Sequence, residues 1–189
     1  MTDERELIKR IVDHELGMFL SVPADGEYSC RQQPQSFRLH RRAQFSIWSV
    51  DTLNSYLQDL LHAEAEGVNL MTIKYARMDD LIPKTNDNPL IDSIVAIQYR
   101  WQQEIFSKYP SLMEGARPLS SSEDSAFGTS FETYLRGELE SYSDNTLALL
   151  YRDMNDLQKK GVNGSERVYR YLVRELGYDS LEEAERRGR

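Results

Sequence analysis

The sequence predicts an all-α fold, a single helical domain built from two tandem, pseudo-symmetric four-helix repeats. Apolar residues recur at helical spacing along most of the chain, and no alternation of period two persists. A degenerate copy of residues 36–49 returns at residues 130–143, an offset of 136 − 42 = 94. Residues 7–12 resemble residues 90–95 at an offset of 90 − 7 = 83, so the second copy carries 94 − 83 = 11 more residues in its loop.

The size and composition of the chain predict one domain. With 189 residues, of which 40% are hydrophobic and 29% charged, the chain can bury one core but not two independent ones. We therefore expect the two repeats to share a core within a single domain. The expected parts of residues 1–189 are repeat one at about 4–80, a hinge at 81–88, repeat two at about 89–177 and a charged tail at 178–189.

The charge pattern argues against nucleic acid and membrane partners. The net charge is −8, and 23 basic residues are scattered among 31 acidic ones, so no basic face for a phosphate backbone is expected. No apolar run approaches the roughly 20 residues that a membrane helix requires. The first residues contain no signal-peptide core, and we expect a cytoplasmic protein. The sequence points to no particular cofactor or oligomeric state.

The single cysteine, Cys30, agrees with a reducing compartment because it cannot form an intrachain disulfide. It falls in an expected loop that also contains Pro23 and Gly26. A catalytic thiol is not expected there, since the sequence pairs no base with it.

In the first copy we expect four helices. The first runs over about 4–19, with Asp3 and Glu6 as a capping box, and the second begins at Pro34. The third runs to about residue 66 after a Ser49 cap, and the fourth covers about 70–80 after an Asn69 cap.

In the second copy we expect helices over about 89–108, 130–142, 143–160 and 165–176. Thr129 and Glu132 are expected to form the capping box of the second of these, and Ser143 to cap the third. A short capped turn at Ser180 is expected before a frayed end. Residues 109–128 form the longest irregular stretch, which suits either a lid or binding loop or a surface excursion.

Four polar residues fall within apolar helix faces. On a helical wheel Glu15 lies in the middle of the apolar arc of the first helix, and Gln98 occupies the equivalent place in the second copy. Gln44 and Glu138 form a second equivalent pair. A buried carboxylate without a partner costs several kcal/mol or becomes protonated, so these groups need partners, a ligand or a proton.

These residues support two hypotheses. In the first, the protein is an enzyme acting on a small anionic metabolite, by acid/base or transfer chemistry, in a polar cleft between the repeats. Glu15 and Glu138 would be the catalytic acid and base or would bind a metal. The expected substrate-binding residues are Arg42, Gln44, Tyr75, Arg77, Gln98, Arg136 and Tyr169. In the second, the protein is a non-catalytic ligand- or protein-binding module, and the same Glu, Gln, Arg and Tyr residues form a structural network.

A resident metal is not expected. His14, His40 and His62 fit no metal-ligand spacing, and no Glu-x-x-His pair is present. A di-iron bundle of the carboxylate type is therefore not predicted.

Four segments of the chain resemble a bacterial family known as domain of unknown function four-one-two-five. They are residues 29–49, 69–78, 117–124 and 129–139, the last being the most specific. The resemblance covers nearly the whole chain and implies a bacterial, soluble, stand-alone domain. It places Glu15, Arg42, Arg136 and Glu138 among the family motifs.

Overall fold

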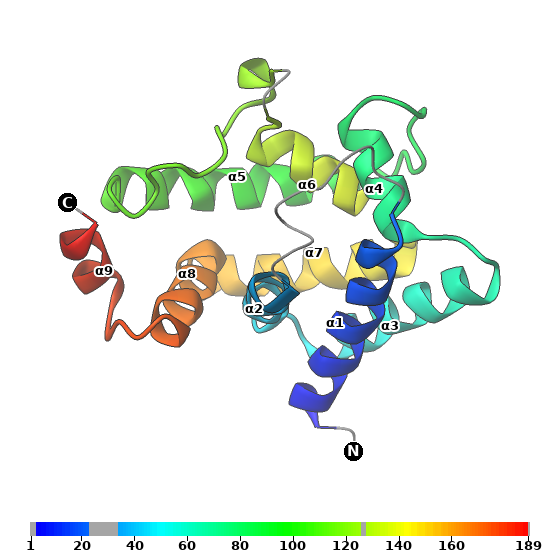
Figure 1. Ribbon diagram of the computed structural model, residues 1–189, viewed down its shortest axis with the longest axis horizontal. Coiled ribbons are helices and arrows are strands. Elements are labelled where there is room, and N and C mark those ends of the chain that lie inside the picture. Colours follow the sequence, from blue (N-terminus) through cyan, green and yellow to red (C-terminus); the bar gives the residue numbers. More distant parts are fainter. Residues whose placement is uncertain (1–2, 23–33, 126–127, 189) are drawn as a thin grey trace.

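The computed structural model describes residues 3–22, 34–125 and 128–188, and over these ranges the fold is all-α, as predicted (Figure 1). Cys30 and its expected loop lie outside them. The described part contains no β-strand, only one isolated bridge between Ser125 and Gly128. Its helices are α1 Glu4–Leu20, α2 Pro34–Phe45, α3 Val50–Ala65, α4 Leu70–Met78, α5 Leu90–Lys108, the 3-10 turn η2 Ser121–Glu123, α6 Phe131–Leu139, α7 Asp144–Lys159, α8 Gly164–Glu175 and α9 Leu181–Arg187. None of them is long and apolar enough to cross a membrane.

Four predicted helix caps are confirmed. The side chains of Ser49, Asn69 and Ser143 each accept a hydrogen bond from the backbone N–H three residues later. Asp3 accepts from the N–H of Arg5, so it caps α1 by itself rather than through a box with a glutamate. Each cap satisfies an N–H group that the helix leaves without an internal partner.

The predicted start of α6 was wrong by one residue. Ser130, not Thr129, is the cap and accepts from the N–H of Thr133 at 3.1 Å. Glu132 does not close a capping box, because its carboxylate accepts the N–H of Ser121 at 3.0 Å and so ties the preceding loop to the helix. Tertiary contacts of the loop therefore replace the expected local motif.

Helix α8 also begins earlier than expected, at Gly164 rather than Ser165. Asn163 caps it through the N–H of Glu166 at 3.0 Å, and its amide donates to the carbonyl oxygen of Trp101 at 3.0 Å. The same side chain thus starts α8 and fixes that start on α5.

Helices of each half of the chain pack both on one another and on helices of the other half. Helix α1 packs against α2 and α3, and α5 packs against α6, α7 and α8. In addition α2 of the first half packs on α8 of the second, α4 packs on α6, and α3 packs on α7. The larger hydrophobic core therefore contains residues of both halves.

Helices α3 and α7 cap each other. Asp153 of α7 accepts hydrogen bonds at the start of α3, from the N–H of Ser49 at 2.8 Å and the hydroxyl of Thr52 at 2.5 Å. Asp59 of α3 accepts the N–H of Ser143 at the start of α7 at 3.1 Å. Each helix start is thus satisfied by a carboxylate from the other half.

The expected hinge, residues 81–88, is held against the second half. The hydroxyl of Thr85 donates to the carbonyl oxygen of Glu140 at 2.8 Å, and the amide of Asn88 donates to Asp144 at 2.8 Å. Polar residues that mark a linker in sequence here bond to helix ends and fix the linker in place.

The C-terminal segment is a docked helix where the sequence suggested a charged, frayed end. Leu181 is fully buried in a second, smaller core cluster with residues of α5 and α8. The carboxylate of Glu185 accepts the N–H groups of Ser111 and Leu112 at 3.2 and 2.8 Å. Helices α9 and α3 lie toward opposite ends of the molecule (Figure 1).

The close approach of α8 to α5 can be tested by substitution. A Cβ atom at Gly164 would lie 2.5 Å from the ring of Trp101, whereas one at Gly17 would meet nothing within 4 Å. We expect Gly164→Ala to destabilise the protein by about 1–3 kcal/mol, because the indole must move. Gly17→Ala, in the interior of α1, should stabilise it by about 0.5–1 kcal/mol. Urea unfolding of both variants measures this, and equal effects of the two substitutions would contradict the contact.

Candidate functional site

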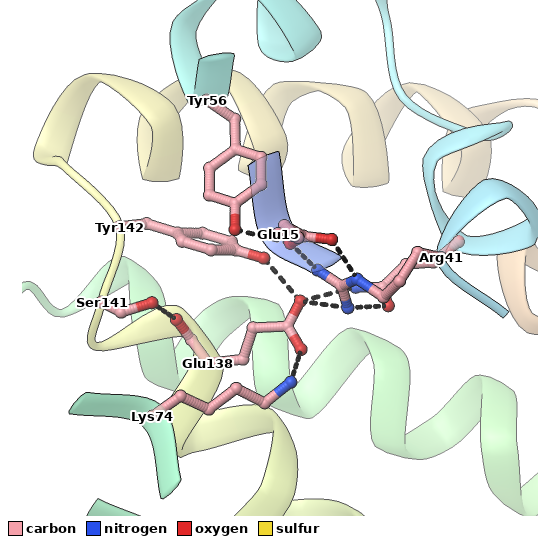
Figure 2. Close-up of polar contacts among 8 residues, drawn as sticks. Glu15, Arg41, Tyr56, Lys74, Glu138, Ser141 and Tyr142 are labelled. Carbon is pink, nitrogen blue, oxygen red and sulfur yellow. Dashed lines mark hydrogen bonds and ion pairs between the residues drawn. The ribbon is translucent and has the colours of Figure 1, made fainter. Parts of the chain in front are cut away.

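Four charged side chains from four helices meet in the middle of the fold: Glu15 of α1, Arg41 of α2, Lys74 of α4 and Glu138 of α6 (Figure 2). Their exposed fractions are 0, 4, 1 and 1%, so all four are buried. Two carboxylates face two cations, and the formal charges cancel. We call this set the buried network.

Arg41 is the centre of the buried network. Its Nε and Nη2 atoms donate to the two carboxylate oxygens of Glu15 at 2.7 and 2.5 Å, a bidentate pair. Its Nη1 atom donates to Glu138 at 3.0 Å and to the amide oxygen of Gln44 at 2.7 Å. The hydroxyl of Tyr56 completes the shell of Glu15 at 2.7 Å.

Glu138 is equally well bonded. Lys74 Nζ donates to Oε2 at 2.7 Å, while the amide of Gln44 and the hydroxyl of Tyr142 donate to Oε1 at 2.9 and 2.6 Å. The ammonium of Lys74 also lies 3.8 Å from the ring centroid of Tyr134. These partners meet the condition for burying a carboxylate, which is a counter-charge and a full set of hydrogen bonds.

Glu138, Arg41 and Lys74 stay ionised at neutral pH. Burial alone would raise the pKa of Glu138, but the charges of Arg41 and Lys74 outweigh it and hold that pKa well below its ordinary value. Burial would lower the pKa values of Arg41 and Lys74, and the carboxylates, Glu138 foremost, reverse this and raise both. Burial, with the neighbouring carboxylates, raises the pKa of Tyr142, so its hydroxyl remains a donor.

A groove of about 710 Å³ lies beside the buried network. Arg41, Gln44 and Glu138 form part of its wall, so the network and the groove share a boundary. Residues of six helices and of segment 112–117 complete it. Eight of the lining side chains are aromatic: Phe19, Phe37, Trp48, Tyr75, Trp101, Phe131, Tyr134 and Tyr169.

Several polar groups of the groove have unused hydrogen-bonding capacity within the described part of the chain. The amide of Gln102, which is 5% exposed, donates to the hydroxyl of Tyr169 at 2.8 Å, and this leaves its carbonyl oxygen without a donor. The amide of Gln98 and the hydroxyls of Tyr75 and Tyr134 have no hydrogen-bond partner there. Groups of this kind suit a bound molecule.

Two other features of the structure give less support for a binding site than the groove does. No group of three or more His, Cys, Asp or Glu residues within 3–22, 34–125 and 128–188 is placed to hold a metal ion. A second hollow, of about 530 Å³ along α5 and α8, is lined by charged side chains that pair with one another. Glu166 there accepts from Arg170 at 2.6 Å and from Lys108 at 3.5 Å.

A family model with the description "Protein of unknown function (DUF4125)" matches residues 5–186. The chain belongs to the DUF4125 family. This confirms the resemblance drawn from the sequence motifs, and the match includes every residue of the buried network and the groove. Neither the curated proteins nor the solved structures contain a match to this DUF4125 chain.

Of the expected site residues of this DUF4125 chain, six lie in the buried network or in the groove beside it. Glu15, Gln44 and Glu138 meet around Arg41, and the last two of these also border the groove. Gln98, Tyr75 and Tyr169 line the groove but do not bond to the network. The equivalent positions Glu15 and Gln98 therefore occupy different surroundings.

The arginines expected to bind substrate lie elsewhere. Arg42 is exposed, and its neighbour Arg41 enters the network, because Arg41 shares a helix face with Phe45, whose ring its guanidinium covers at 4.7 Å. Arg136 forms an ion pair with Asp92 at 2.5 Å. Both corrected residues are equivalent in the repeat alignment, and both point away from the core.

Arg77, which was also expected to bind substrate, instead holds parts of the fold together. Its Nε atom lies 2.5 Å from the carboxylate of Glu140, and its Nη1 atom donates to the carbonyl oxygen of Ile82 at 2.6 Å. It braces the end of α4 against α6 and the linker, outside both the network and the groove.

Besides Arg41, sequence reasoning missed Lys74 and Tyr56 as members of the site in this DUF4125 chain. Lys74 lies within the stripe of Leu70, Met71 and Tyr75, where a lysine can be buried only with a counter-charge. Tyr56 lies among the leucines of α3 in the same way. A charged or phenolic residue inside an apolar stripe was the sequence feature that could have indicated both of them.

Neighbouring arginines provide a matched test of the network. We expect Arg41→Met to lower the free energy of unfolding by about 3–5 kcal/mol, since it leaves buried carboxylates without their counter-charge. Arg42→Met removes the same charge from the exposed face of the same helix, and its effect should stay within about 0.5 kcal/mol. Urea unfolding at neutral pH compares the two, and similar losses would refute a network centred on Arg41.

The ionised state of Glu138 predicts acid sensitivity. Its folded-state pKa lies below the ordinary value of 4.5, so the unfolded chain binds the proton more readily. The stability it contributes is present above that value and is lost as the pH falls toward the folded-state pKa. The wild type should therefore lose stability more steeply than Glu138→Gln between about pH 5 and 3. Urea unfolding over this range measures both slopes, and parallel curves would contradict the assignment.

Proposed function

We propose that this protein binds a small organic molecule in the groove, and that the buried network is the scaffold that holds one wall of the groove in place. The observation that carries the proposal is the groove itself, with a volume of about 710 Å³. Small-molecule sites typically have volumes of about 300–1,000 Å³, mostly apolar linings and a few convergent polar groups. The aromatic wall and the unpaired amides and hydroxyls fit that description.

The electrostatics favour binding over acid/base catalysis. A catalytic acid or base works best with a pKa near the operating pH, and the pKa of Glu138 is held far below it. Glu15 is fully buried and does not border the groove. The two carboxylates therefore support the scaffold of the binding module better than they support proton transfer.

The groove offers little free positive charge for an anionic ligand. The charge of Arg41 is balanced by Glu15 and Glu138. Arg117 is the one arginine of the lining without an ion pair among the described residues; it is exposed, stacks 4.9 Å from the ring centroid of Tyr134 and donates to Thr129. Burial lowers the pKa of the nearby His40, which leaves its imidazole neutral at pH 7. An uncharged ligand is the better match.

A second candidate is the enzyme expected from the sequence, one that acts on a small anionic metabolite by acid/base or transfer chemistry. The observation that favours it is the shared wall, since a molecule in the groove would contact Arg41 and Glu138. The two candidates differ in the fate of the bound molecule, which the enzyme would convert and the module would release unchanged.

We also propose that the chain consists of two tandem copies of one helical unit. Mirrored hydrogen bonds support this. Asn69 donates to the carbonyl oxygen of Met18 at 2.9 Å, and Asn163 donates to that of Trp101 at 3.0 Å. The donors are separated by 163 − 69 = 94 positions and the acceptors by 101 − 18 = 83, the same two offsets that relate the copies in sequence.

A cytoplasmic location in a bacterium stays a prediction of the sequence. The lone cysteine in 189 residues and the motifs of residues 129–139 support it. Fractionation of a bacterial cell that expresses the chain, with an antibody against it, would test the location.

The binding proposal is tested by thermal shift. We expect at least one member of a screen of heterocycles, amino acids, organic acids and phosphates to raise the melting temperature. A ligand at 100 times its dissociation constant stabilises the native state by about 2.7 kcal/mol, a shift of roughly 5–10 °C at this chain length. Val168→Phe fills the groove and should abolish the shift, while Val50→Phe on the exposed start of α3 should preserve it.

Three results of that screen are decisive. A hit that survives Val168→Phe binds elsewhere and overturns the groove as the site, and a screen without any hit overturns binding. For a hit that passes, NMR of the compound incubated with the protein shows whether it is converted. Conversion that is lost in Glu138→Gln would favour the enzyme over the binding module.

A further inference from the structure

In the proposed repeat, the positions equivalent to those of the buried network line the groove. The offsets of 83 and 94 that relate the two copies connect four pairs of residues. They pair network residues with groove residues as follows: Glu15 with Gln98, Arg41 with Leu135, Lys74 with Val168, and Glu138 with Gln44. All four second members line the groove.

These replacements account for the empty space. The long cationic side chains of Arg41 and Lys74 reach across the network in the first half. Leu135 and Val168 stand at the equivalent positions and are shorter and apolar. Space that the first half fills with its own guanidinium and ammonium groups is open in the second half.

The replaced carboxylates indicate what would fill that space. In the first half, the two oxygens of Glu15 accept two hydrogen bonds from the guanidinium of Arg41, at 2.7 and 2.5 Å. Gln98 has the same shape but offers one acceptor and one donor. Its planar complement carries one donor and one acceptor on the same edge, as an amide, a lactam or a urea does. A guanidinium has two donors and a carboxylate two acceptors, so neither fits.

The neighbours of Gln98 extend this pattern. Gln102 lies one turn along α5, and its carbonyl oxygen has no donor within the described residues. The rings of Trp101, Tyr75 and Tyr134 line the same groove as these amides. Aromatic walls favour a flat ring, which can stack or meet them edge to face.

We propose that the ligand is an uncharged, flat ring that carries an amide-like edge, bound by Gln98 and Gln102. This inference rests on the proposed function, because it names the ligand class of the same groove. It also assigns specificity to two glutamines that the buried network does not use.

The two tryptophans of the chain provide the measurement. Trp48 and Trp101 both line the groove, so quenching of tryptophan fluorescence reports its occupancy without a label. Three probes of one ring and similar size separate the chemistries: benzamide offers a donor and an acceptor, benzoate two acceptors and benzamidine two donors. We expect benzamide to bind the wild type about tenfold more tightly than either of the others.

Variants of α5 test whether Gln98 and Gln102 cause the preference for benzamide. Gln98→Glu restores the acid that the first half has at Glu15, and it should shift the preference from benzamide to benzamidine. Gln102→Leu should weaken benzamide by about tenfold, because a hydrogen bond is lost in a buried place. Gln103→Leu is the same change on the exposed side of the same helix and should leave binding unchanged.

The outcomes separate the ligand class from the groove itself. Tightest binding of benzoate or benzamidine to the wild type would overturn the amide-edged ligand and leave the groove as a binding site. Equal binding of benzamide to Gln102→Leu and Gln103→Leu would also overturn it. If neither the three probes nor any compound of the thermal-shift screen quenches the tryptophans, both this inference and the proposed function fail.

Discussion

The fold depends on the pairing of Arg41 with two carboxylates that come from opposite halves of the chain. Glu15 belongs to α1 and Glu138 to α6, and one guanidinium bonds to both. An ion pair in the core adds little stability compared with apolar packing, but the loss of one partner is costly. The network therefore acts mainly as a constraint, since only one arrangement of α1, α2, α4 and α6 satisfies all its members.

The network also forms part of one wall of the groove. Its salt bridges hold the wall that Arg41, Gln44 and Glu138 present to the groove. A rigid polar wall beside a soft aromatic one is a common way to orient a ligand without large motion of the backbone. In the proposed repeat, Leu135 and Val168 stand at the positions equivalent to Arg41 and Lys74, and this difference distinguishes the groove from the network.

The sequence predicted the fold class, most helix starts and the inward direction of Glu15, Gln44 and Glu138, because these follow from helical spacing and cap chemistry. It did not predict which arginine pairs with them. The repeat alignment drew attention to Arg42 and Arg136, since these are identical at equivalent positions, whereas Arg41 is replaced by Leu135 in the second copy. Helical spacing relative to Phe45 was the better guide. The groove was not predictable either, because a hollow results from how several helices pack and not from one pattern.

The reciprocal caps of α3 and α7 carry a consequence for how the protein folds and arose. Asp153 accepts the N–H of Ser49 at the start of α3 and Asp59 that of Ser143 at the start of α7, so separation of the halves would leave these two N–H groups without their carboxylate partners. The halves should then unfold together in one cooperative transition, despite their separate positions in the chain. The same geometry would serve two identical chains related by a two-fold axis. In the proposed tandem repeat, a single copy of the unit would meet such a capping carboxylate only by pairing with a second copy.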